Sequence, residues 1–241
     1  MAVAYVLAHF DDEYAALPII LRRAREGVDQ RFFYVADYAT PEISRVRLAE
    51  TRALLASLGL DPNHARHIGL GSGAQDGALH RSLPQAFSRL ETALAAEAFE
   101  RLVVPAWEGG HHDHDACAFM AVRLAAGRPV EQFGLYQGRG LPGPLFRASA
   151  PLAENGPVMR ERLSAGDWLR FAAAVRFFPS QAKTWAGLWP MMFAQYLLAG
   201  GFAWQQLAPS RVRERPHPGS LLYERRFGVD YEDLRAALDA L

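Results

Sequence analysis

Cysteine and lysine are almost missing from this 241-residue chain, which has Cys117 as its only cysteine and Lys183 as its only lysine. A single cysteine excludes a disulfide within the chain and a metal site built from cysteines alone. The other basic residues are arginines, a bias typical of a GC-rich bacterial genome rather than of a function. Arginine also suits bidentate contacts to carboxylate or phosphate, so a substrate with an anionic group is one alternative.

Net charge is missing as well, because 26 acidic residues balance 26 basic ones. Nothing in this balance points to nucleic acid, and we expect no such partner. Half of the residues are hydrophobic and 22% are charged, as in an ordinary folded protein. The first residues, MAVAYVLAHFDDE, lack the basic region of a signal peptide, so we expect a cytoplasmic protein.

Charged residues are absent from 184–210, TWAGLWPMMFAQYLLAGGFAWQQLAPS, a segment long enough to span a bilayer. Pro190, Gln195 and Gly200–Gly201 interrupt it. We therefore expect buried helices of a soluble domain or a hydrophobic lid, with a membrane span as the alternative.

Three of the five tryptophans lie in this segment: Trp185, Trp189 and Trp204. Flat aromatic side chains suit both sugar stacking and subunit contacts. We expect the segment to form one wall of a substrate cleft. A contact between subunits of a homo-oligomer is a second role that it could have.

Apolar runs alternate with helical patterns through the first half of the chain. This alternation predicts an α/β fold with a Rossmann-like, mostly parallel sheet flanked by helices. We expect one domain over 1–241, with a core of about 1–137 and a less regular C-terminal cap of about 138–241. The expected strands are 3–8, 31–36, HARHIGL, 101–106 and 130–136, and the expected helices are 13–26, PEISRVRLAETRALLASLGL, LPQAFSRLETALAAEAF and a pattern ending near Ala126.

Patterns in the second half are weaker. APLAENGPVMRERL and SLLYERRF are expected to carry strands. SAGDWLRFAAAVRFF is expected to be a helix capped by Ser164, and DYEDLRAALDAL a C-terminal helix with Asp230 near its start.

Two polar clusters lie just past the ends of predicted strands: AHFDDE at 8–13 and EGGHHDHD at 108–115, which contains HHDH at 111–114. In parallel sheets, ligands bind beyond the carboxyl ends of the strands. Like charges crowded there predict a cation that neutralises them. His9, Asp12 and one histidine of the second cluster would form a two-histidine, one-carboxylate set typical of catalytic zinc, and iron(II) is the alternative metal. Asp11 would then lie beside the metal-bound water as its general base.

These clusters resemble the LmbE/PIG-L family of zinc-dependent N-deacetylases, whose signatures are A-H-P-D-D-E and H-x-D-H. RLAETRALLASLG also resembles the family's Arg-x-x-Glu helix, so the resemblance covers about residues 3–136. It implies that the metal ligands are His9, Asp12 and His114 and that Asp11 activates water.

The resemblance gives roles to three further residues. His111 would stabilise the oxyanion or protonate the leaving amine, Asp113 would orient a neighbouring imidazole, and Arg47 would contact substrate. An ion pair between Arg47 and Glu50 is the alternative. Tyr136, at the end of a predicted strand, is a candidate substrate-binding residue.

The chain departs from the family pattern at two positions. Phe10 stands where proline is usual, and His112 stands where proline is common in H-P-D-H. Phe10 bears on the turn geometry and on the substrate shelf, and His112 is a rival ligand to His114.

We therefore expect a zinc-dependent N-deacetylase that acts on an N-acetylglucosamine-like sugar or its conjugate, with metal-bound water as nucleophile. One alternative is an amidase for a larger acyl group or a sugar–thiol conjugate. Another is a non-catalytic metal- or sugar-binding module, against which the intact Asp11 argues, because binding alone needs no base.

Overall fold

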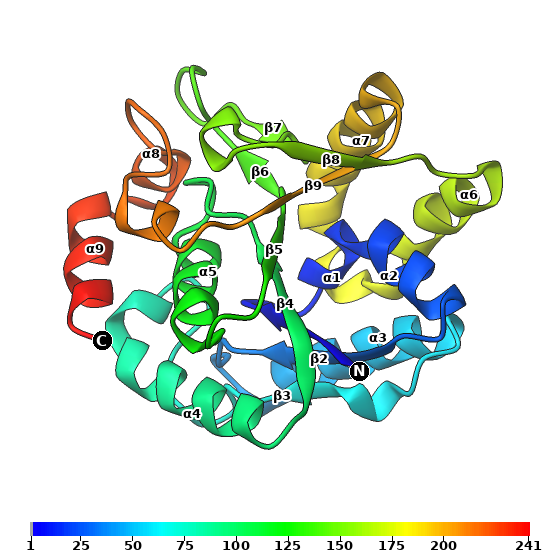
Figure 1. Cartoon of the computed structure of the whole chain (residues 1–241), viewed down its shortest axis with the longest axis horizontal. Helices are drawn as coiled ribbons and strands as arrows, with labels where there is room; N and C mark the ends of the chain where they lie inside the picture. Colours follow the sequence, from blue (N-terminus) through cyan, green and yellow to red (C-terminus); the bar gives the residue numbers. More distant parts are fainter. Residues whose placement is uncertain (1) are drawn as a thin grey trace.

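A seven-stranded sheet forms the centre of the computed structural model, which describes residues 2–241 (Figure 1). Its strand order is β3-β2-β1-β4-β5-β9-β8. The first five strands along the chain pair in parallel, and β9 pairs antiparallel with both β5 and β8. The strands are β1 (Ala2–Leu7), β2 (Asp29–Tyr34), β3 (Ala65–His67), β4 (Phe99–Pro105), β5 (Val130–Phe133), β8 (Val158–Glu161) and β9 (Phe202–Gln206). The predicted mostly parallel α/β architecture is confirmed.

Helices cover both faces of the sheet. Side chains of β1 alternate between two hydrophobic clusters, with Ala4 and Val6 in one and Val3, Tyr5 and Leu7 in the other. One cluster includes residues of α4, α5 and α9, and the other residues of α2, α3, α6 and α7. The helices are α1 (Asp12–Ala15), α2 (Leu17–Arg25), α3 (Pro41–Ser57), α4 (Leu83–Ala95), α5 (His112–Leu124), α6 (Ala165–Ala174), α7 (Ala182–Ala199), α8 (Leu222–Phe227) and α9 (Tyr231–Asp239).

Local signals explain several boundaries. The Thr40 side chain accepts a hydrogen bond from the backbone N–H of Ile43, and Pro41 occupies the first helical position of α3. Ser164 caps α6 as predicted, with Oγ accepting from the N–H of Asp167 at 3.1 Å. A small antiparallel hairpin, β6 (Tyr136–Gln137) and β7 (Arg147–Ala148), is connected by residues 138–146, GRGLPGPLF, which are rich in proline and glycine.

The strand predicted at SLLYERRF is wrong, because Leu222–Phe227 is helix α8. The carboxylate of Glu224 accepts a hydrogen bond from the backbone N–H of Leu221 at 2.7 Å, which satisfies a free donor at the helix start. Gly228 then ends the helix in a left-handed conformation. An apolar run this short fits a strand or a buried helix equally well.

The charge-free segment contains a strand as well as the expected helix. Helix α7 ends at Gly200, and Gly201 has a φ of 143° with its backbone pressed against that of Glu161. A Cβ at this glycine would lie 2.1 Å from the Glu161 carbonyl oxygen, so only glycine fits. The chain then returns as β9, an element that the charge-free pattern did not predict.

Within residues 2–241, no helix is both long and apolar enough to cross a membrane. Strands β8 and β9 extend the same sheet as the first half of the chain. The division into a core of about 1–137 and a cap of about 138–241 stays a prediction.

Candidate functional site

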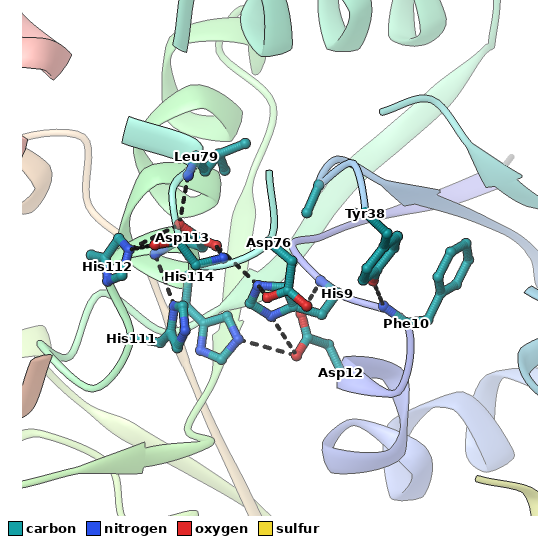
Figure 2. Close-up of polar contacts among 12 residues, drawn as sticks. His9, Phe10, Asp12, Tyr38, Asp76, Leu79, His111, His112, Asp113 and His114 are labelled. Atoms are coloured by element: carbon teal, nitrogen blue, oxygen red, sulfur yellow. Dashed lines mark hydrogen bonds and ion pairs between the residues drawn. The ribbon is translucent and has the colours of Figure 1, made fainter. Parts of the chain in front are cut away.

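The two polar clusters meet at the carboxyl edge of the sheet. His9, Asp11 and Asp12 follow β1, and the 111–114 cluster begins α5 shortly after β4. Because β1 and β4 are neighbouring parallel strands, both clusters lie at one edge. Figure 2 shows the imidazole of His114 reaching Asp12, whereas His112 lies on the far side of Asp113.

His9, Asp12 and His114 form one compact and buried set of donor atoms. His114 Nε2 lies 3.1 Å from Asp12 Oδ1, and His9 Nδ1 lies 3.8 Å from the same oxygen. Two donors on one zinc ion, each about 2.0–2.1 Å from it, are separated by roughly 3.3 Å. The three residues predicted as ligands therefore come together at separations that fit one small divalent cation.

His112 lies outside this set. Its Nε2 is 2.8 Å from the carbonyl oxygen of Gly77, and its side chain groups with His80 and Asp113 instead. A further grouping joins His9, His111 and Asp113.

Asp113 fixes the orientation of His9. Its Oδ2 lies 3.0 Å from His9 Nε2, so Nδ1 of that ring is the nitrogen left toward Asp12. The same carboxylate accepts hydrogen bonds from the backbone N–H groups of Gly77 and Leu79, at 2.7 and 3.0 Å. Burial opposes ionisation of Asp113, but the hydrogen bond to His9 and the surrounding histidines hold its pKa well below the usual range.

Asp11 has an unusual backbone and a long-range partner. Its φ of 97° is rare for a residue other than glycine, a strain typical of functional sites. Its Oδ2 accepts a hydrogen bond from Trp185 Nε1 at 2.9 Å, while Glu13 accepts one from its backbone N–H. Burial and the neighbouring charges of Asp12 and Glu13 raise the pKa of Asp11 well above its usual value.

His111 is a buried, neutral imidazole at the start of α5. Its Nδ1 accepts a hydrogen bond from the backbone N–H of Asp113 at 3.1 Å. This contact assigns the ring proton to Nε2. Burial lowers the pKa of His111 well below its usual value.

A cavity of about 350 Å³ opens onto these groups. Helices α3, α7 and α8 and the β6–β7 hairpin region complete its walls. Besides His9, Asp11, Asp12, His111 and His114, the lining includes Arg47, Asp76, Leu135, Tyr136, Phe146, Gln181, Lys183, Thr184, Trp185, Gly187, Leu188, Arg226 and Phe227.

The charge-free segment contributes to this cavity through Trp185 alone among its tryptophans. Trp189 packs against Phe193, with ring centroids 5.3 Å apart, and Trp204 lies on β9. The predicted cleft wall is thus formed by the first turns of α7.

Arg47 and Tyr136 both line the cavity. The Arg47 guanidinium lies 3.2 Å from Asp76 and 4.8 Å from the ring of Tyr38. The alternative ion pair with Glu50 is wrong, because that carboxylate accepts hydrogen bonds from the N–H and hydroxyl of Ser180.

Phe10 is fully buried and packs on Tyr34 and Tyr38. Its ring therefore packs in the protein interior and does not line the cavity.

Sequence reasoning did not identify Asp76, whose Oδ1 lies 3.2 Å from His9 Nε2. Its glycine-rich loop carries no local pattern that indicates this contact.

Among solved structures, a deacetylase triple mutant of the teicoplanin biosynthetic pathway matches with 17% identity and a TM-score of 0.63, covering 86% of this chain and 98% of that chain. The A40926 pseudoaglycone deacetylase Dbv21 matches with 17% identity and a TM-score of 0.59, covering 86% and 96%. GalB, the 4-carboxy-2-hydroxymuconate hydratase from Pseudomonas putida KT2440, matches with 14% identity and a TM-score of 0.56, covering 86% and 95%. At such identities these matches show a shared fold, and the fold carries more than one reaction.

Comparison with curated protein sequences gives no match. A family model does match: PIG-L, described as GlcNAc-PI de-N-acetylase, aligns with residues 4–125. This range is half of the chain and contains both polar clusters, so the chain belongs to the PIG-L family.

Proposed function

We propose that this chain is a metal-dependent hydrolase that removes the N-acetyl group from an N-acetylglucosamine-like sugar or sugar conjugate. The observation that carries the proposal is the buried His9–Asp12–His114 donor set, with a carboxylate and a neutral imidazole beside it on one cavity. Family membership and the deacetylases among the structural neighbours support the same reaction class.

His9, Asp12 and His114 would hold the metal. Two imidazoles and one carboxylate suit zinc, and iron(II) is the alternative. One of the structural neighbours, a teicoplanin deacetylase, is described in a zinc inhibited form. When bound, such a cation lowers the pKa of water and polarises an amide carbonyl.

Asp11 would act as the general base. Its Oδ2 accepts the hydrogen bond from Trp185, and its Oδ1 has no hydrogen-bond partner among the described residues. Oδ1 is therefore the atom that would take a proton from the attacking water. As the water oxygen bonds to the acetyl carbon and the C–N bond breaks, this proton passes to the leaving nitrogen, giving acetate and a free amine.

His111 would act as a hydrogen-bond donor to the developing oxyanion. Its Nδ1 is engaged by the backbone, so Nε2–H is the group available to the cavity. A neutral imidazole held in one orientation can stabilise charge in the transition state without reorganising. Asp113, through His9, would keep the ligand ring in place.

Arg47 and Tyr136 would contact the sugar or its substituent. They lie on different walls of the cavity, and the aromatic rings of Trp185 and Phe227 provide flat faces nearby. Such faces suit the apolar sides of a sugar ring.

Incubation of the zinc-loaded chain with a panel of N-acetyl sugars and conjugates tests the proposal. Mass spectrometry should show loss of acetyl from at least one compound, with acetate in excess over enzyme. Loss of a larger acyl group would identify the amidase alternative, and binding without turnover would identify a non-catalytic module. Addition of water to an unsaturated acid, the reaction named for the hydratase neighbour, would contradict the proposal.

A further inference from the structure

A second group of metal-type side chains lies directly behind the candidate active site. It consists of His80, His112 and Asp113, which offer donor atoms that all lie within 4.8 Å of one another. His80 belongs to a short 3-10 helix, η2 (Leu79–Ser82), and His112 is the first residue of α5. Two elements that are distant in sequence thus bring two imidazoles to one carboxylate.

The two histidine groups contact different oxygens of that carboxylate. His112 Nε2 lies 3.3 Å from Asp113 Oδ1, whereas His9 Nε2 lies 3.0 Å from Oδ2. Figure 2 shows His112 and His9 on opposite sides of Asp113. The second group therefore has no residue in common with the His9–Asp12–His114 set, although its Asp113 contacts His9.

Both imidazoles have an unsatisfied nitrogen. His112 is 1% exposed, and its Nδ1 has no hydrogen-bond partner within residues 2–241. Nδ1 of His80 is likewise buried without a partner in the same described range. The two rings meet edge to face with centroids 5.0 Å apart. A buried polar atom without a partner is destabilising, so each of these nitrogens would be stabilised by a ligand.

Helix formation does not explain a histidine at position 112. Proline is favoured at the first helical residue, because its missing N–H needs no partner there. Histidine offers no such advantage, and its side chain instead reaches Gly77 and His80. The rings of Tyr223 and Phe227 pack against the His112 ring, each with its centroid 6.0 Å from the His112 centroid, and exclude solvent from that side.

We propose that His80, His112 and Asp113 bind a second divalent metal ion. Two imidazoles and a carboxylate favour zinc or a similar borderline cation. This site should bind more weakly than the first one, because Asp113 already accepts hydrogen bonds from two backbone N–H groups and contacts His9. The proposal concerns metal binding alone and stands apart from the proposed activity.

The test is a zinc titration of the full chain after removal of metal with a chelator. Native mass spectrometry and calorimetry should show two zinc ions per chain, bound in two steps of different affinity. Saturation of the wild-type chain at one zinc ion would overturn the proposal.

Two variants test which residues bind the weaker zinc ion. His112→Pro keeps a favoured first helical residue, and His80→Asn leaves α5 unchanged. Each should lose the weaker ion and keep the tighter one, whereas retention of both ions would contradict the assignment. Circular dichroism checks that each variant is folded.

His217→Asn is the matched control. His217 is also buried and has an unpartnered nitrogen among the described residues, but it belongs to none of the candidate metal groups. This variant should bind two ions. His114→Ala should lose the tighter ion, so failure at the first site and failure at the second site give different results.

Discussion

Trp185 Nε1 donates a hydrogen bond to Asp11 Oδ2 at 2.9 Å, across 174 positions of the chain. Both side chains are buried and both line the cavity. The contact ties α7 to the loop after β1 and leaves one oxygen of Asp11 available to a reactant. The charge-free segment thus forms one wall of the cavity and also supplies Trp185, which positions Asp11.

Trp185→Phe should lower kcat by about tenfold, because hydrogen bonds to charged groups contribute about 1.5–3 kcal/mol and only part of this is lost when the carboxylate reorients. KM and metal content should change little. Steady-state kinetics and metal analysis check this. Trp189→Phe is the control, since Trp189 does not line the cavity, and unchanged kcat in Trp185→Phe would remove the positioning role.

Asp11→Asn should keep the metal and lose roughly 10²–10⁴-fold in kcat, the usual contribution of general acid–base catalysis. An amide can accept the Trp185 hydrogen bond but cannot take a proton from water. Turnover close to that of the wild-type chain would exclude Asp11 as the base.

His114→Ala should bind the tighter metal ion far more weakly, because it removes the ring whose Nε2 lies 3.1 Å from Asp12. Metal analysis at equal protein concentration measures the loss. Full occupancy at the tighter site would move the ligand assignment to another histidine, with His112 as the rival named from the sequence.

Glu108 should make stability depend on pH. It is 1% exposed and accepts hydrogen bonds from the backbone N–H groups of Leu135 and Tyr136. Burial raises its pKa to about 8, against an ordinary value of 4.5. The folded chain therefore keeps this proton over a range in which the unfolded chain releases it.

The contribution of Glu108 to the free energy of unfolding is complete below about pH 4.5 and is lost as the pH rises through about 8. The slope is at most about 1.4 kcal/mol per pH unit. Urea unfolding of the wild-type chain and of Glu108→Gln from pH 5 to 8 measures it. The variant should have the flatter profile, and parallel profiles would show that Glu108 is ionised in the folded chain.

The sequence predicted the parts of the fold that depend on local pattern. The parallel strands, the helices between them and the edge where the two clusters meet follow from apolar periodicity and strand order. Family resemblance predicted the donor set of His9, Asp12 and His114, which the fold brings together.

Other features depend on contacts that no local pattern contains. SLLYERRF is a helix because Glu224 caps it, and β9 exists because Gly201 allows the chain to return beside Glu161. The position of Trp185 against Asp11 and of Asp76 against His9 is decided by how distant elements pack.

The most direct test of the account is acetate release by chelator-stripped protein as zinc is added back. With a substrate from the N-acetyl sugar panel, the stripped chain should be inactive. Activity should rise with zinc and reach its maximum near one equivalent per chain, as expected for one catalytic ion held by three protein ligands. Equal acetate release with and without metal, or no release at any zinc level from any N-acetyl compound, would contradict the account.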